Sequence, residues 1–519
     1  ALMERVMRSV GNGYQALVDS VGYDGVFLEL QFNKLNAQHL VNRALIEFAK
    51  RNSLTDKLIV TCDSHYSQPD HWRERELYKK LGWLNYTEFN PDSLPKSRED
   101  LKCELYPKNA DQVWDSYKDT TQEYSFYSDS DVCDAIERTY DIAHDMIGDI
   151  SPDRSVKLPT YVIPEDKTAD AALIDECKKG MISRGLRGNK EYLDRLKSEL
   201  RVIRSKDFAE YFLTTKAIID LAREQMFVGP GRGSGAGSLV NYVLGITDVD
   251  PIKYGLLFER FLSPERKELP DIDTDVGDRD KLLEILREEF GSENIIPISN
   301  YNTFKLKSLV KDISRFYGIE FKEVNAMLST LERDIKNGLR QDGISLNGPL
   351  EPTLEWALKY SQKFQAFVDK YPEIAEPIDV LFKQNKALGR HAGGVIVSEN
   401  VKERMPLIKA KGELQTPWVE GASYKHLEHF GWVKFDLLGL ETLRIIQRTI
   451  ELILRRKEGI PNPTFKQVRK WFDNNMDPLK MDLDDQDVFR NVYHGGRWAG
   501  IFQCTQQGAQ KLFQRAQPE

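Results

Sequence analysis

The chain has 519 residues, 40% of them hydrophobic and 30% charged, which predicts a soluble protein of three or four domains with sizeable cores. Its net charge of −8 excludes a protein that binds nucleic acid through an overall basic surface. Any contact with nucleic acid must therefore come from local basic groups.

The cysteines are scattered and form no C-x-x-C pair, which excludes a disulfide framework or a zinc knuckle. No signal peptide or apolar span of membrane length is present, so we expect a cytoplasmic protein without a membrane partner. The five cysteines are Cys62, Cys103, Cys133, Cys177 and Cys504.

Residues 1 to about 152 form the first region. Two short apolar runs, Val26–Leu30 and Leu58–Thr61, flank a helical pattern from Ala37 to Lys50, which predicts a βαβ-like fragment. The second run leads into Asp63 and His65, a pair whose spacing at a strand end would suit a metal ligand set.

A proline-rich connector from Ser151 to Asp166 separates this region from a helical one. Aromatic and leucine side chains there, such as Tyr211, Phe212 and Leu221, are expected in the core. The predicted helices run over Ala171–Met181, Glu191–Arg204 and Phe208–Glu224.

A glycine-rich loop follows, and its spacing matches neither a Walker loop nor a full dinucleotide-binding fingerprint. Its backbone N–H groups are expected to converge on an anion at the N-terminus of a helix that begins near Ser238, with Arg232, Gly233 and Ser234 suited to phosphate oxygens. The alternative is a glycine linker. Apolar residues on both sides of the loop favour a strand, a turn and a helix instead. The glycines are Gly229, Gly231, Gly233, Gly235 and Gly237.

Alternating carboxylates come next, at Asp271, Asp273 and Asp275. Alternate residues of a strand share a face, so Asp271 and Asp273 can point to one place, where a divalent cation would relieve their repulsion. Alone, this pattern also fits a solvated edge or a loose calcium loop. Beside a phosphate-binding loop it predicts nucleotidyl or phosphoryl transfer with two metal ions.

The segment Thr303–Gly318 has apolar residues at helical spacing and a second face bearing Lys307, Lys311 and Arg315. This basic stripe could follow a phosphate backbone, and its alternative is a solvated helix face.

Two later stretches return to the chemistry of the site. Arg390 and His391 precede a glycine pair and could reach phosphate or DNA, or could decorate a turn before a strand. Asp436 lies in an apolar run, where an unpaired carboxylate would be costly to bury, so a metal shared with Asp271 and Asp273 is its expected partner. We expect Lys434 on the opposite face of that strand. Beyond Thr442 a helix is predicted to Arg456.

In this order, GPGRGSGAGSLVNYVLGITDVDP, LLFERFLSPER, PDIDTD, GRHAGGVIV, VKFDLLGL and GIFQCTQQG resemble the motifs of the C-family bacterial replicative DNA polymerases, of the polymerase III alpha type. The resemblance covers nearly all of the chain. It implies an α/β and α+β multidomain protein with a nucleotidyltransferase-like palm built on a mixed sheet. It favours the type without an inserted zinc module.

The resemblance also implies the domain order. The expected domains are the C-terminal part of a PHP-like α/β domain (1–152), a linker and first part of the palm (153–300), a helical thumb (301–384), the second part of the palm (385–445) and the start of the fingers (446–519). Earlier metal-binding histidine motifs of the PHP domain would lie upstream, so Asp63 and His65 are expected to be structural remnants. The rest of the fingers, a clamp-binding peptide and an oligonucleotide-binding module are expected to be absent.

The implied activity is template-directed DNA synthesis, with Asp271, Asp273 and Asp436 holding two Mg2+ ions. Arg232, Gly233, Ser234 and Arg266 would bind the β and γ phosphates of a dNTP, and the family motif gives Lys434 a similar role. Primer-template DNA and other replisome subunits, such as a sliding clamp, are the implied partners. Two alternatives remain: a nucleotidyltransferase with a non-DNA acceptor, and a DNA-binding scaffold fragment without turnover.

Overall fold

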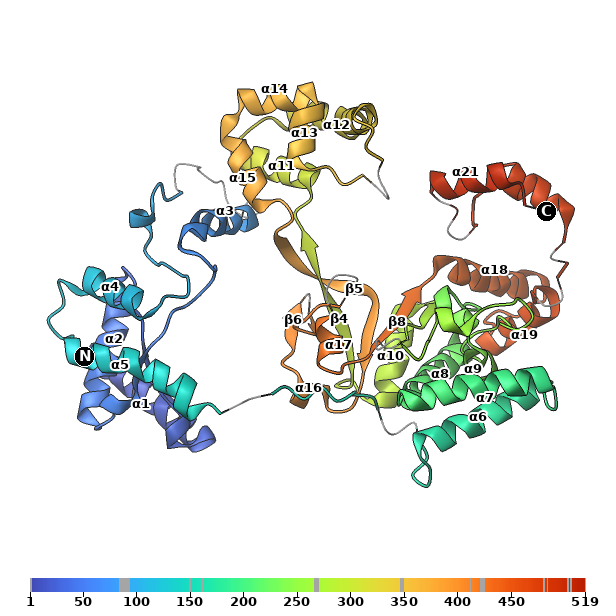
Figure 1. The fold of residues 1–519 in the computed structure, drawn as a ribbon, viewed down its shortest axis with the longest axis horizontal. Coiled ribbons are helices and arrows are strands. Elements are labelled where there is room, and N and C mark those ends of the chain that lie inside the picture. Colours follow the sequence, from blue (N-terminus) through green and yellow to red (C-terminus); the bar gives the residue numbers. More distant parts are fainter. Residues whose placement is uncertain are drawn as a thin grey trace. The chain divides into compact units, whose positions relative to one another are not determined.

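The structure is a computed structural model, and it describes all residues except 1, 84–93, 149–150, 160–162, 266–269, 346–349, 411, 421–424, 479–480, 483, 502–503, 505 and 519. The chain divides into two compact units. One contains residues 1–151 and 302–387, and the other contains residues 152–301 and 388–519. Each unit is described by itself (Figure 1).

The N-terminal part of the first unit is a βαβ arrangement, as predicted. Strands β1 (Leu28–Leu30) and β2 (Leu58–Val60) pair in parallel, and α2 (Asn36–Arg51) connects them. Side chains of both strands enter one apolar core with residues of α4 and α5. The remaining elements are α1 (Leu2–Val21), η1 (Tyr23–Gly25), η2 (Thr55–Lys57), η3 (Pro69–His71), α3 (Trp72–Trp83), η5 (Arg98–Asp100), α4 (Ala110–Thr121), α5 (Asp129–Asp141) and η6 (Ile142–Met146).

The second part of the first unit is helical, also as predicted. Helix α11 (Leu306–Phe316) buries the apolar face that its sequence indicates, including Leu309 and Ile313, in a core shared with Leu77 of α3. The other elements are α12 (Phe321–Gln341), α13 (Leu354–Tyr360), α14 (Gln362–Lys370), η10 (Pro372–Ile374) and α15 (Ala375–Leu381).

Three helices open the second unit: α6 (Ala169–Ser183), α7 (Lys190–Ser205) and α8 (Ala209–Gln225). The side chains of Thr168 and Asn189 cap the first two, which explains where these helices begin. In Figure 1 the three helices lie together, and their apolar faces share one core with the neighbouring sheet. All three predicted helices are therefore confirmed, and Tyr211 and Phe212 are buried as expected.

The central sheet of this unit is mixed, in the order β3-β8-β5-β4. Strand β8 (Lys434–Gly439) lies between β3 (Asp273–Val276), to which it is parallel, and β5 (Asn385–Val397), to which it is antiparallel. The long strands β5 and β4 (Ile295–Thr303) run together in Figure 1. Helix α10 (Arg279–Phe290) follows β3 directly.

Shorter elements complete the second unit, and the helix predicted beyond Thr442 is confirmed as α18. In the part of the chain that the structure describes, no helix is long and apolar enough to cross a membrane. The remaining elements are η8 (Gly233–Gly237), α9 (Leu239–Val243), η9 (Phe258–Arg260), α16 (Val401–Arg404), β6 (Ile408–Ala410), β7 (Glu413–Gln415), α17 (His426–His429), α18 (Glu441–Lys457), α19 (Phe465–Asn475), α20 (Gln486–Val488), η11 (Phe489–His494) and α21 (Gln507–Ala516).

Candidate active site

Three carboxylates meet on the central sheet. Asp273 of β3 is the register partner of Asp436 of β8, and Asp271 lies two residues before Asp273. One oxygen from each of the three lies within 4.8 Å of the others. Direct cross-strand partners have neighbouring side chains, so strand pairing itself brings together acids that are far apart in the sequence.

Lys434 lies on the same face of β8 as Asp436, and the expectation that it points to the opposite face is wrong. Its Nζ is 2.7 Å from Asp436 Oδ2 and 3.9 Å from Asp271 Oδ2. Residues two apart on a strand share a face, so alternation itself requires this arrangement. Burial acts to lower the pKa of Lys434, but Asp436 and Asp271 outweigh it and raise that pKa.

The carboxylate cluster has the properties of a divalent cation site. Burial, and then the neighbouring acids, raise the pKa of Asp271 and of Asp273, although Lys434 acts in the opposite direction. Asp436 is only 6% exposed, and its buried Oδ1 has no hydrogen-bond partner. A buried acceptor without a donor, next to two more carboxylates, fits the oxygen-rich ligand set that Mg2+ prefers.

Glycines beside the cluster leave room that side chains would fill. A Cβ on Gly393 of β5 would lie 3.3 Å from Asp436 Oδ1 and 2.5 Å from Leu438. The N–H groups of Gly393 and Gly394 donate to Nδ1 of His391, at 3.2 and 2.6 Å. His391 Nδ1 is therefore an acceptor occupied by its own strand, and burial lowers the pKa of the ring. A role for His391 at a phosphate stays a prediction.

The glycine-rich loop begins from an extended segment that pairs with β3. Val228 forms an antiparallel bridge with Val276, and the Gly229 N–H donates to the Asp275 carbonyl at 2.8 Å. Further along, the Asp248 N–H donates to the carbonyl of Pro230 at 2.7 Å. The loop is thus fixed to the sheet at its start, and the alternative of a glycine linker is wrong.

Arg232 connects the loop to the acidic strand. Its Nη1 donates to Asp275 Oδ1 at 2.9 Å, and its Nε is 3.9 Å from Asp273 Oδ2. Asp275 therefore pairs with a basic residue. Gly233 has a left-handed φ of 62°, and a Cβ there would lie 3.3 Å from Asp273 Oδ2. Glycine suits this position because the turn needs that conformation and the loop passes close to the carboxylate.

The N-terminus of α9 is already occupied by an anion of the protein, which corrects the expectation of an external one. The Ser238 hydroxyl and the N–H groups of Leu239 and Val240 donate to the Glu199 carboxylate at 2.9 to 3.0 Å. Any phosphate contact of this loop must therefore come from the turn before Ser238. Ser234 lies half-buried in that turn, η8.

A buried tyrosine, Tyr211, contacts the backbone of the acidic segment. The Tyr211 hydroxyl accepts from the N–H of Ile272, between Asp271 and Asp273, at 3.2 Å. Its ring stacks on Phe435, which neighbours Asp436, with ring centroids 5.5 Å apart. Burial raises the pKa of the Tyr211 hydroxyl, which therefore stays protonated.

The structure does not bring all of the predicted site residues to the carboxylate cluster. Arg390 pairs with Glu413 at 2.8 Å and lies 3.6 Å from Asp280, so its described partners are acids outside the cluster. Arg266 falls outside the described residues.

On α11, Lys307 pairs with Glu332 at 2.7 Å, and Lys311 lies over the Phe321 ring. Arg315 is exposed on the same helix. In the first unit, Asp63 and His65 contact each other at 3.1 Å and are about half exposed. Among the described residues, only the Asp271 cluster groups three potential metal ligands, and the role of Asp63 and His65 as structural remnants stays a prediction.

Sequence reasoning missed two groups that hold the loop. The first is the ion pair of Glu199 and Arg195. The second is Asp248, which accepts hydrogen bonds from Arg184 at 2.9 Å and from Arg223 at 2.8 Å. A usable signal existed for Glu199, because it falls between Leu196 and Ile203 on the apolar stripe of α7. An acid on such a stripe requires buried donors.

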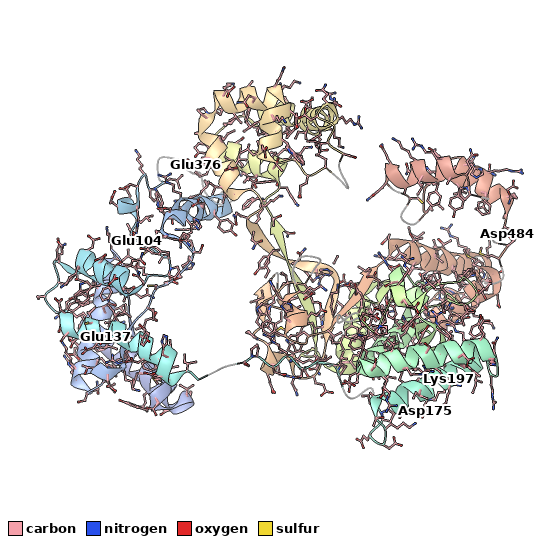
Figure 2. The ribbon with its side chains drawn as sticks, viewed as in Figure 1. Glu104, Glu137, Asp175, Lys197, Glu376 and Asp484 are labelled. Atoms are coloured by element: carbon pink, nitrogen blue, oxygen red, sulfur yellow. The ribbon has the colours of Figure 1, made fainter. Side chains whose placement is uncertain are left out.

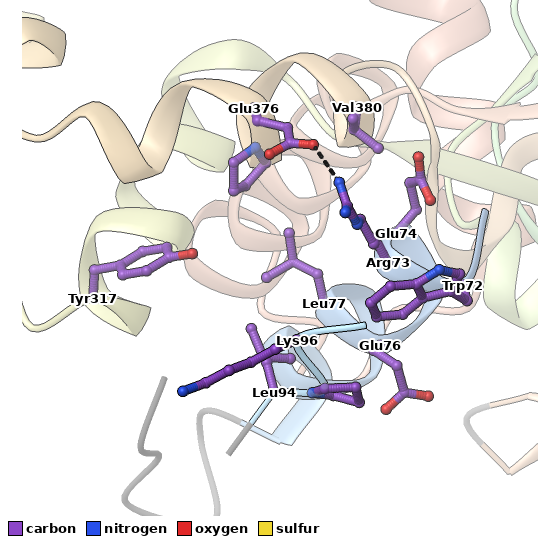
Figure 3. A pocket seen from close by; sticks show the side chains of 12 residues that line it. Trp72, Arg73, Glu74, Glu76, Leu77, Leu94, Lys96, Tyr317, Glu376 and Val380 are labelled. Carbon is purple, nitrogen blue, oxygen red and sulfur yellow. Dashed lines mark hydrogen bonds and ion pairs between the residues drawn. The ribbon is translucent and has the colours of Figure 1, made fainter. Parts of the chain in front are cut away.

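A cavity of about 160 Å³ lies elsewhere, in the first unit, between α3 and α15 (Figure 3). Trp72, Leu77 and Tyr317 line it, and Arg73 pairs with Glu376 across it at 3.4 Å. It holds none of the predicted site residues.

The model of the family described as "Bacterial DNA polymerase III alpha NTPase domain" matches residues 171–439, a span that contains the glycine-rich loop and all three carboxylates. The chain belongs to the bacterial DNA polymerase III alpha family. It is 32% identical to the DNA polymerase III subunit alpha of Aquifex aeolicus, over 96% of this chain and 42% of that protein.

Similar identities are found with other alpha subunits. The chain is 28% identical to the subunit of Campylobacter jejuni, over 99% of this chain and 42% of the relative. It is 30% identical to that of Treponema pallidum, over 97% of this chain and 39% of the relative. The chain thus spans about two fifths of the length of these DNA polymerase III alpha relatives.

Proposed function

We propose that this chain carries the nucleotidyl-transfer site for template-directed DNA synthesis, in which a dNTP is joined to a primer 3′-hydroxyl. The observation that carries the proposal is the convergence of Asp271, Asp273 and Asp436 from two paired strands, beside a glycine-rich loop. The DNA polymerase III alpha family supplies the substrate class.

Asp271, Asp273 and Asp436 would hold two Mg2+ ions, which when bound favour ionisation of the 3′-hydroxyl and neutralise the triphosphate. The partnerless Oδ1 of Asp436 and the room left by Gly393 support this assignment. Lys434 compensates part of the carboxylate charge through its 2.7 Å contact with Asp436. Tyr211 orients the acidic segment through its hydrogen bond to the Ile272 N–H.

The turn Arg232–Gly233–Ser234 would bind the phosphates of the dNTP. Arg232 lies beside the carboxylates through its bond to Asp275, and its planar guanidinium suits phosphate oxygens. Lys434, Arg390, His391 and Arg266 would contribute further positive charge or hydrogen bonds. These groups would neutralise the charge that builds up as pyrophosphate leaves.

The domain assignments belong to the same proposal. Residues 153–300 and 385–445 would form the palm, 301–384 the thumb, 446–519 the start of the fingers, and 1–152 part of a PHP-like domain. Lys307, Lys311 and Arg315 on α11 would contact the DNA backbone, which positions a duplex without reading its sequence. Other replisome subunits, such as a sliding clamp, would be further partners.

Single-nucleotide extension of a primed template with Mg2+ tests the proposal. We expect incorporation by the chain, with or without a fingers segment supplied in trans, and its loss in Asp273→Asn with duplex binding unchanged. Glu284→Gln removes an exposed carboxylate from α10 and should leave incorporation intact. Retained incorporation in Asp273→Asn would refute the site assignment. Incorporation without a template would refute the proposal of template-directed DNA synthesis.

A second candidate function is a DNA-binding scaffold without turnover. The basic face of α11, with Lys307, Lys311 and Arg315, would serve this function without the carboxylate cluster. Binding of primed DNA without incorporation, under every condition that includes the fingers segment, would establish this alternative.

A further inference from the structure

Helix α7 carries an ion pair against the glycine-rich loop, in which Glu199 is buried and Arg195 is partly exposed. Glu199 is 1% exposed, and its Oε1 accepts from Arg195 Nε at 2.6 Å, one turn earlier on the helix. Lys197, between them in sequence, is exposed on the same helix (Figure 2). Burial raises the pKa of Glu199, while the N–H groups of Leu239 and Val240 and the Arg195 guanidinium act in the opposite direction.

Both members of the pair reach the end of the loop. Glu199 accepts from the Ser238 hydroxyl and from two N–H groups of α9, so its two oxygens have four donors in all. Arg195 Nη2 donates to the carbonyls of Gly237 at 2.9 Å and Leu256 at 3.2 Å. One ion pair thus fixes residues 237–240 and the connector that follows them.

The loop has little freedom to compensate if this anchor is lost. At the other end of the loop, the Gly229 N–H donates a hydrogen bond to the backbone carbonyl of Asp275 in β3. Near the anchor, a Cβ on Gly237 would lie 2.6 Å from the carbonyl oxygen of Leu257, so the backbone there is tightly enclosed. Between the two fixed ends lies the turn that holds Arg232 beside Asp273 and Asp275.

We propose that Glu199 and Arg195 are positioning residues for the glycine-rich loop, holding the turn from Arg232 to Gly237 in the conformation that receives the triphosphate. The inference rests on the proposed function for its ligand, but its structural part stands on the anchor itself. Neither residue contacts the carboxylate cluster through any described bond. They would act through the loop alone.

Hydrogen exchange tests the anchor without reference to activity. Glu199→Gln keeps the shape of the side chain but loses the charge, and hydrogen bonds to a charged group are the stronger kind. We expect amide exchange over residues 229–244 to rise by roughly tenfold or more, with α6 and α8 unchanged. Asp194→Asn, which removes an exposed carboxylate from the same helix, should change nothing. Unchanged exchange over 229–244, or a rise spread evenly over the unit, would overturn the proposal.

Binding measurements separate positioning of the loop from general damage. With a non-hydrolysable dNTP analogue and Ca2+, Glu199→Gln should weaken nucleotide binding by about tenfold. Mn2+ binding, followed by electron paramagnetic resonance, should stay at the wild-type level because the carboxylate cluster is not touched. Equal losses of nucleotide and Mn2+ binding would overturn the positioning role.

Arg195→Lys provides a second variant if Glu199→Gln fails to fold. Lysine keeps the charge beside Glu199 but cannot donate to Gly237 and Leu256 in the fork geometry of arginine. We expect an intermediate rise in exchange over 229–244 with a full complement of Mn2+. Wild-type exchange in this variant would show that Arg195 does not position the loop.

If the wild-type chain binds no nucleotide, the proposed function fails, and exchange alone decides the role of the anchor.

Discussion

The ammonium group of Lys434 lies 2.7 Å from the Asp436 carboxylate, on the face of β8 where Asp271 and Asp273 converge. Without a bound cation, this lysine provides the nearest positive charge for the buried acid. Its Nζ is also 3.9 Å from Asp271, so it interacts with acids from both segments of the site. A divalent cation bound there would share these carboxylates with it.

Lys434→Met should therefore raise the affinity of the cluster for Mn2+. The lysine repels an incoming cation and screens its ligands, and a unit charge at this distance in a half-buried site is worth about tenfold or more in binding. Titration by electron paramagnetic resonance would measure the change, with Lys402→Met, an exposed lysine on α16, as the control. Weaker or equal Mn2+ binding would show that the ammonium does not compete. Incorporation is expected to fall all the same, because the lysine is also a proposed phosphate contact.

Asp275→Asn and Asp273→Asn should have different effects. Asp275 accepts from Arg232, whereas Asp273 lies in the carboxylate cluster. We expect Asp275→Asn to keep Mn2+ binding near the wild-type level while weakening binding of the dNTP analogue, because Arg232 loses a charged acceptor that holds it in place. Asp273→Asn should reduce Mn2+ binding by about tenfold or more. Calorimetric titration of both ligands decides the matter, and loss of Mn2+ binding in Asp275→Asn would make that residue a metal ligand.

Gly393→Ala should damage both stability and the site. The new methyl group would meet the Leu438 side chain at 2.5 Å and the Asp436 carboxylate at 3.3 Å. Overpacking of this kind costs about 1–3 kcal/mol, and β5 would have to shift away from β8. Thermal unfolding and Mn2+ binding would both report the change. Gly13→Ala in α1 meets nothing within 4 Å and should be neutral or slightly stabilising.

Asp271→Asn should raise the melting temperature of the metal-free protein at neutral pH. Burial and then the neighbouring acids raise the pKa of Asp271 in the folded state, so its ionised form is disfavoured there relative to the unfolded chain. The corresponding stability is present at low pH and is lost as pH rises through the raised pKa. The difference in melting temperature between Asp271→Asn and the wild type, measured by calorimetry in the presence of a chelator, should thus shrink as the pH falls toward about 4. A difference in melting temperature that is constant with pH would mean that the charge of Asp271 is not its cause.

The basic face of α11 can be tested by salt dependence. If Lys311 and Arg315 each contact a phosphate, replacing both with Gln should lower the slope of log affinity against log salt by about 2. Fluorescence anisotropy on primed duplexes measures the slope, with Lys197→Gln on α7 as the control. An unchanged slope would make this stripe a solvated helix face.

Much of the fold and the three carboxylates could be predicted from the sequence, because they depend on local pattern. The apolar spacing of α11 and the isolated acid Asp436 in an apolar run are visible in the residues themselves. The apolar stripe of α7 indicates that Glu199 is buried, but three of its four donors lie on a different segment, and only the fold brings them to it. The position of Lys434 beside Asp436 follows from strand periodicity, because residues two apart share a face, so the expectation of the opposite face is wrong.

The helix N-terminus at Ser238 shows a different limit. A glycine-rich turn followed by a helix suggests an anion, and an anion is present, but the protein supplies it from α7. Sequence alone does not distinguish an internal carboxylate from an external phosphate. The two chemistries use the same donors.

The strand order places β8 between β3 and β5, although β8 comes last in the chain. Strands β4 and β5 pair with each other, but β3 joins them only through β8, so one edge of β3 and one edge of β5 stay open to other chains until β8 is made. Closing this contact over a long stretch of sequence is also a slow step of folding. Asp436 lies on β8, so the three carboxylates come together only when these two edges are covered.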